Sequence, residues 1–195
     1  MTASRLGTLE SRHRGRLAEI LAATRFFSTE EVRVALELFD ETFGAVGGGR
    51  WEVGADSEPS PPSHLPPPTS AYEFFGTFDT ADNLLGYACY GPTPGTNGTF
   101  DLYWLAVHPA AQGAGEGSRL LGEVERRLRA RAGRLLIVET SSRDAYEPTR
   151  RFYGSRGYRE AARISDFFAP ADDRVIYAKR LTPRTTSADK PSSAH

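Results

Sequence analysis

The sequence predicts an α/β protein of the α+β kind, with a mixed, mostly antiparallel sheet and flanking helices. Three observations support this. Strand-like runs follow one another between residues 72 and 107, and the short, turn-rich links between them favour antiparallel hairpins. A glycine-rich turn then joins the third run to an amphipathic helix. Another apolar run, a helix and two final strand-like runs complete the chain. Its 195 residues suffice for one domain with a sizeable core.

The composition excludes several classes of protein. Lys and Arg number 24 against 25 Asp and Glu, so the chain lacks the basic excess of a nucleic-acid-binding protein. The single Cys89 excludes an internal disulfide, and four scattered histidines give no metal-ligand pattern, so we expect no metal. No apolar run approaches the ~20 residues of a transmembrane helix, and none follows the basic N-terminus as in a secretory signal. We therefore expect a cytoplasmic protein without nucleic-acid or membrane partners.

The ends of the chain and one internal segment look irregular. Residues 1–16 are arginine-rich and weakly periodic, which predicts a flexible basic tail. Residues 54–70 hold six prolines and predict an extended surface loop. Residues 183–195 are polar and predict a disordered tail. A single domain is therefore expected over residues 17–182.

The first clear helix follows Ser28. Ser28 and Glu31 have the spacing of a capping box, and apolar residues then recur on one helical face from Val32 to Phe43. Gly44 is a natural end for this helix.

Three strands are expected at residues 72–78, 84–90 and 100–107. The aromatic residues of the first belong either to the core or to an aromatic pocket: they are Tyr72, Phe74, Phe75 and Phe78. Strict alternation in the third puts Asp101, Tyr103 and Leu105 on one face of the sheet. The same rule puts Leu102, Trp104 and Ala106 on the other.

The glycine-rich turn after Val107 is the most informative segment. It reads Gln112, Gly113, Ala114, Gly115, Glu116, Gly117 and Ser118. The helix that follows would bury Leu120, Leu121, Val124 and Leu128. Glycines let backbone N–H groups converge, and a helix N-terminus adds partial positive charge, so this order predicts an anion site suited to a diphosphate. The alternative is that the glycines merely form a turn.

The remaining elements follow in a regular order. An apolar run at residues 135–139 predicts a strand buried on both faces, and residues 146–156 predict a helix with Pro148 in its first turn. Two last strands are expected around residues 161–168 and 175–181.

Two segments resemble a known family. Leu105-Ala106-Val107-His108-Pro109 with Gln112 to Gly117 resembles the acyl-CoA-binding motif of the GNAT superfamily of N-acetyltransferases, and residues 151–158 (RFYGSRGY) are similar to its later helix. The resemblance covers roughly residues 17–182. It implies a sheet splayed into a V that holds coenzyme A. It also implies acetyl-CoA as co-substrate. The acyl group would pass to a primary amine of a small molecule or peptide by direct attack in a ternary complex. Homodimers are common in the family, so a homodimer is one expected assembly.

The resemblance also implies roles for individual residues. Backbone N–H groups of residues 112–118 would bind the phosphates, and the strand edge at Leu105, Ala106 and Val107 would bind the pantetheine arm and polarise the thioester. Tyr153 stands where the family places the acid for the departing thiolate, unless it packs as an ordinary aromatic residue. For the base, some family members carry an acidic residue at the position of Asp101, and other members use water. If Asp101 is not the base, it is an exposed aspartate at the start of a strand. Glu139 is the alternative carboxylate.

The same comparison shows departures from the family pattern. Tyr146 replaces a common asparagine, and Thr149 replaces a common alanine.

The segments expected around the acceptor are rich in carboxylates. Acidic residues occur in the segments expected around it, namely Glu30, Glu31, Asp40, Glu41, Asp166, Asp172 and Asp173. They would suit a cationic amine, unless they form a solvated face.

Two other functions fit parts of the sequence. One is a non-catalytic acyl-CoA sensor on the same fold. The other is a dinucleotide-binding oxidoreductase with Glu139 on the ribose, but Ser118 stands where the third glycine of that fingerprint belongs.

Overall fold

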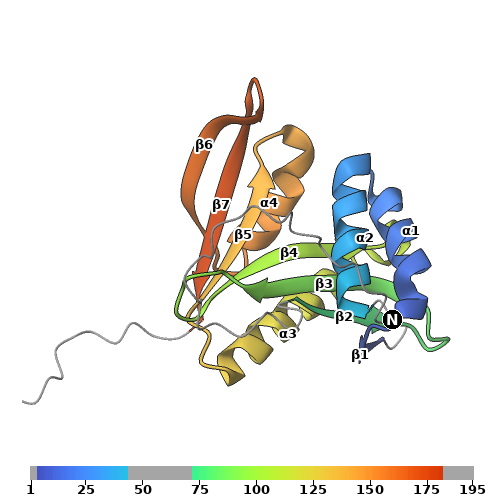
Figure 1. Cartoon of the computed structure of the whole chain (residues 1–195). Helices are drawn as coiled ribbons and strands as arrows, with labels where there is room; N and C mark the ends of the chain where they lie inside the picture. Colours follow the sequence, from blue (N-terminus) through green and yellow to red (C-terminus); the bar gives the residue numbers. More distant parts are fainter. Residues whose placement is uncertain (1–3, 44–71, 182–195) are drawn as a thin grey trace, which may run out of the picture.

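A computed structural model of the chain describes residues 4–43 and 72–181 (Figure 1). Its elements in chain order are β1 (Arg5–Thr8), η1 (Ser11–His13), α1 (Arg14–Thr24), α2 (Thr29–Phe43), β2 (Glu73–Phe78), β3 (Leu84–Pro92), β4 (Thr99–Val107), η2 (Pro109–Ala111), α3 (Glu116–Ala130), β5 (Leu135–Ser141), η3 (Asp144–Tyr146), α4 (Glu147–Gly154), β6 (Arg159–Ala169) and β7 (Asp172–Arg180). They confirm the predicted α/β class.

The strands form one seven-stranded sheet in the order β1-β2-β3-β4-β5-β7-β6. Within the described residues β4 and β5 are parallel, and every other neighbouring pair is antiparallel. The predicted mixed, mostly antiparallel sheet is therefore confirmed. A doubly wound dinucleotide-binding fold needs a mostly parallel sheet, so the oxidoreductase alternative is wrong.

The sheet splits between β4 and β5. Their pairing runs from Thr99 opposite Leu135 to Leu102 opposite Val138, although β4 continues to Val107 and β5 to Ser141. Beyond Leu102 the two strands diverge, as the central ribbons of Figure 1 show. Backbone groups that face the gap are thus left free for a ligand.

A β-bulge lies where the strands separate. Cys89 and Tyr90 are adjacent on β3, yet they pair with Trp104 and Leu102, so Tyr103 is an extra residue on β4. The bulge makes the predicted strict alternation wrong. Leu102 and Leu105 pack on the same side, in the core under α3, whereas Trp104 and Ala106 pack with α1 and α2.

Two hydrophobic cores cover the two faces of the sheet. One contains the predicted α3 residues Leu120, Leu121, Val124 and Leu128, together with Tyr153 of α4. The other packs α1 and α2 on the opposite face and contains Phe74 and Phe78, while Phe75 belongs to the first core. Phe74, Phe75 and Phe78 are thus core residues, not a pocket.

The N-terminal segment differs from the prediction of a flexible tail over residues 1–16. Arg5–Thr8 form β1, which pairs antiparallel with β2, and Arg14 begins α1. The arginines there have carboxylate partners, such as Asp40 for Arg14 at 2.6 Å, so their charge does not prevent order. The proline-rich loop at 54–70 and the tail at 183–195 lie outside the described residues.

Helix α2 begins as the sequence predicts. The Ser28 N–H donates to a Glu31 carboxylate oxygen at 2.7 Å, and the Glu31 N–H donates to Ser28 Oγ at 3.2 Å. These reciprocal bonds are the capping box. In the described residues no helix combines the length and hydrophobicity needed to cross a bilayer.

Candidate active site

A cavity of about 640 Å³ occupies the opening between β4 and β5. Most of the predicted site residues line it: Leu105, Ala106, Val107, Gln112, Gly113, Gly115, Glu116, Gly117, Ser118, Glu139 and Tyr153. The fold therefore gathers the glycine loop, the β4 edge, the end of β5 and helix α4 around one space. Ala114 and Asp101 are not in its lining.

The glycine loop has the geometry of an anion cradle. Gly113 and Gly115 have φ of +77° and +93°, and a Cβ on either would meet nothing within 4 Å. Gly115 is the N-cap of α3, and the first helical bond runs from Arg119 N–H to Gly115 O at 3.0 Å. The N–H groups just before Arg119 have no partner within the helix. With the helix dipole they suit a diphosphate such as that of coenzyme A.

Side chains fix this loop and set its charge. Gln112 Nε2 donates to Val107 O at 3.0 Å, which ties the loop to the end of β4. The Arg156 guanidinium contacts Ser118 Oγ, lies 3.7 Å from the Phe152 ring centroid and lines the cavity. Arg156 thus supplies a cation beside the loop, a role the sequence reasoning missed although the residue lies in the RFYGSRGY segment.

Glu116 is the one acidic member of the loop. It is 7% exposed, and its Oε1 accepts a hydrogen bond from Ser4 Oγ at 2.6 Å, while Oε2 has no partner within the described residues. A carboxylate in the first turn of a helix is stabilised by the helix dipole. Ser4 belongs to the segment expected to be a tail, so that segment helps to fix the loop.

Tyr153 is buried in the cavity wall. It is 5% exposed, and its ring centroid lies 5.2 Å from that of Phe152 and 5.5 Å from that of Tyr158. Burial raises the pKa of Tyr153, so the phenol stays protonated at neutral pH. A protonated, fixed phenol can donate to a developing thiolate.

Asp101 lies below the split, where β4 still pairs with β5 opposite Ile137. Its Oδ2 accepts a hydrogen bond from Thr93 Oγ1 at 2.7 Å. Two residues on, burial raises the pKa of Tyr103 to about 12, and the Asp101 charge adds to this rise. Tyr103 lines the cavity, whereas Asp101 does not.

Glu139 is the carboxylate that β5 contributes to the cavity. It forms an ion pair with Arg174 of β7, whose guanidinium lies 4.7 Å from the centroid of the Phe167 ring. Its side chain is 40% accessible. Glu139 is thus oriented and reachable from the cavity. The strand itself differs from the prediction of burial on both faces, since Leu135 and Ile137 are only half-buried.

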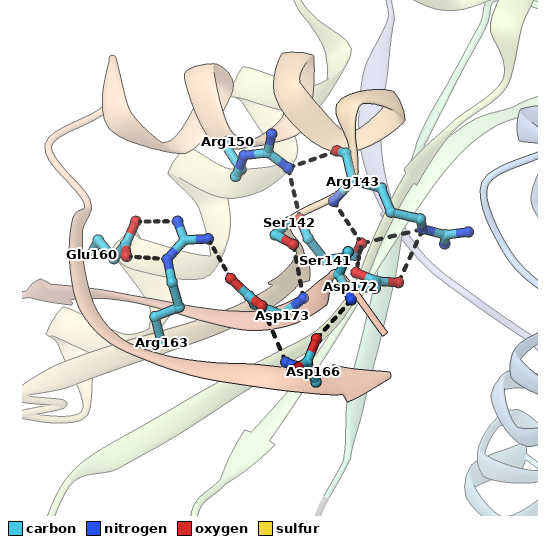
Figure 2. Close-up of polar contacts among 10 residues, drawn as sticks. Ser141, Ser142, Arg143, Arg150, Glu160, Arg163, Asp166, Asp172 and Asp173 are labelled. Atoms are coloured by element: carbon cyan, nitrogen blue, oxygen red, sulfur yellow. Dashed lines mark hydrogen bonds and ion pairs between the residues drawn. The ribbon is translucent and has the colours of Figure 1, made fainter. Parts of the chain in front are cut away.

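The acidic residues expected around the acceptor are not in the lining of the cavity. Figure 2 shows why for the final hairpin: Asp172 binds Ser141 and Arg143, and Asp173 binds Arg163. Asp166 instead accepts a bond from the Ala171 N–H at 2.6 Å. The Asp172 carboxylate ties the hairpin to the end of β5, whereas those of Asp166 and Asp173 bond within the hairpin, and none of the three lines the cavity.

Comparisons with known proteins agree with this geometry. Residues 71–160 match the acetyltransferase (GNAT) domain. A protein from Desulfovibrio desulfuricans assigned to the GNAT acetyltransferases has 36% identity and a TM-score of 0.74, with 93% of this chain and 100% of that chain covered. The chain therefore belongs to the GNAT acetyltransferase family, as the motifs predict. No protein with a curated description matches the sequence.

More distant structures share the fold. The ribosomal-protein-S18-alanine N-acetyltransferase of Escherichia coli has 16% identity and a TM-score of 0.67, with 95% of this chain and 98% of that chain covered. An aminoglycoside 6'-N-acetyltransferase complexed with coenzyme A has 15% identity and a TM-score of 0.65, with 93% and 99% covered.

Proposed function

We propose that the protein is an N-acetyltransferase that moves an acetyl group from acetyl-CoA to a primary amine of a small molecule or peptide. The observation that carries the proposal is that one cavity joins the glycine cradle at α3, the free edge of β4 and the buried phenol of Tyr153. When bound, acetyl-CoA supplies an acetyl thioester, and the amine nitrogen replaces sulfur on the carbonyl carbon.

The chain's own groups have separate tasks in this proposal. N–H groups of residues 113–118 and the Arg156 guanidinium bind the phosphates. Among residues 105–107, the backbone N–H groups that point away from β3 face the opening left by the split. They hold the pantetheine arm and polarise the carbonyl. Tyr153 donates the proton that the departing sulfur needs. Burial raises the phenol's pKa, but the same apolar surroundings raise that of the thiol, so the transfer stays feasible.

The amine must lose a proton before or during attack. Glu139 is our first choice of base because it lines the cavity and Arg174 orients it. It acts directly or through a water. Asp101 is the alternative and would have to act over a longer path from below the split.

The test is transfer of acetyl from acetyl-CoA to an amine panel, with the product identified by mass and with Tyr153→Phe and Glu139→Gln variants. Acetylated product and a loss of rate in the Tyr153 variant would support the proposal. Acetyl-CoA binding without any product would favour the non-catalytic sensor. A cytoplasmic location and a homodimer stay predictions.

A further inference from the structure

Aromatic rings are frequent among the cavity-lining residues outside the glycine loop and α4. Five of the lining residues are aromatic there: Phe26, Phe27, Tyr103, Trp104 and Tyr146. The first two come from the link between α1 and α2, the next two from the β4 bulge, and the last from η3. Three separate segments thus converge to make an aromatic wall, and we use that term for these five residues.

Part of this wall is fixed by a bond across the fold. The Tyr146 hydroxyl donates to the Phe26 carbonyl at 2.7 Å, and the two ring centroids are 5.6 Å apart. On β4 the Tyr103 and Trp104 rings lie 6.4 Å apart at an interplanar angle of 29°. Rings that are held in place before a ligand arrives lose little entropy when they bind it.

The same part of the lining carries little charge. Among the described lining residues outside the glycine loop and α4, Glu139 is the one that is charged at neutral pH. That carboxylate is already paired with Arg174. One ammonium group could be accommodated by Glu139 and by the faces of the rings. Further ammonium groups would be desolvated against aromatic carbon without a counter-charge, which is costly.

We infer that the acceptor is a primary amine with a single positive charge carried on an aromatic body, as in an arylalkylamine. The inference rests on the proposed acetyltransferase function and narrows its substrate class. The aromatic wall binds the ring of the acceptor and directs its nitrogen toward Glu139. The apolar surroundings also lower the pKa of the amine, which eases the loss of its proton before attack.

The test compares kcat/KM at saturating acetyl-CoA for 2-phenylethylamine and tryptamine with that for spermidine and kanamycin. We expect the aromatic amines to be preferred by at least about tenfold, as expected when two or three aromatic contacts are gained. Equal or better use of either polycation would overturn the inference alone. No transfer to any amine while acetyl-CoA binds would refute the transferase function on which the inference rests. Acetyl-CoA binding is measured separately by calorimetry, and its absence would instead refute the proposed function.

A pair of variants separates the ring from the bond that fixes it. Phe26→Ala removes one ring of the wall but keeps the carbonyl that accepts from Tyr146, whereas Tyr146→Phe keeps both rings and removes the bond. Phe26→Ala should lower kcat/KM for 2-phenylethylamine by about three- to tenfold and leave the Kd for acetyl-CoA unchanged. Phe168→Ala is the matched control, because Phe168 is 51% exposed on β6 and outside the cavity lining. An unchanged kcat/KM in Phe26→Ala would overturn the inference.

Discussion

Replacing Tyr153 by phenylalanine removes one oxygen atom from the proposed acid. The ring stays packed, because its contacts with Phe152 and Tyr158 at centroid distances of 5.2 and 5.5 Å do not involve the hydroxyl. Loss of a general acid typically costs a factor of about 10²–10⁴. We therefore expect kcat to fall about 100-fold, while KM for acetyl-CoA changes less than about twofold.

The assay is steady-state acetyl transfer between pH 6 and 10, and the upper limit of this range reaches the ordinary phenol pKa of about 10. Burial raises the pKa of Tyr153, so its deprotonation should not lower the wild-type rate within this range. Tyr177→Phe is the matched control: its ring centroid is 6.5 Å from that of Tyr153, and it is outside the cavity lining. A folded Tyr153→Phe enzyme with wild-type kcat would refute the acid role and leave Tyr153 as a packing residue.

Three further perturbations test the cradle, an ion pair and the cysteine. Gly115→Glu puts a side chain at φ +93° and a like charge beside the phosphates, so the Kd for acetyl-CoA should rise in calorimetry, by about 10- to 100-fold from the charge. Gly95→Glu, at φ +71° in an equally open turn, should leave it unchanged. Hydrogen bonding to Arg126 lowers the pKa of Glu123 from 4.5 to about 2, so this carboxylate stabilises the fold above pH 4.5 and loses that contribution toward pH 2. Between pH 4.5 and 2 the urea midpoint of Glu123→Gln should therefore depend less steeply on pH than that of the wild-type protein. The same pH dependence in both proteins would contradict this. Cys89 is fully buried and burial raises the pKa of its thiol, so a thiol reagent should modify it only on unfolding.

The elements that could be predicted from the sequence are those with strong local signals. The capping box at Ser28 and Glu31, the buried face of α3 and the glycine loop each depend on residues close in the chain. The family was predicted from two short segments and the fold class from the order of strand-like and helical runs, and both predictions are confirmed.

The features that could not be predicted depend on partners far away in the sequence. The bulge at Tyr103 changes which residues share a face, and it is defined by pairing with β3 rather than by β4 itself. Residues 5–8 are a strand only because β2 offers an edge, and the Tyr146 hydroxyl meets the carbonyl of Phe26, 120 residues earlier. A single sequence carries no local signal for such contacts, so the aromatic wall could not be predicted from it.

The most direct test of the central claim is calorimetric titration of the purified chain with acetyl-CoA, with NADH as the control ligand. The account predicts saturable binding of acetyl-CoA that is weakened in Gly115→Glu but not in Gly95→Glu, and no binding of NADH. A folded protein that binds no acetyl-CoA would contradict it.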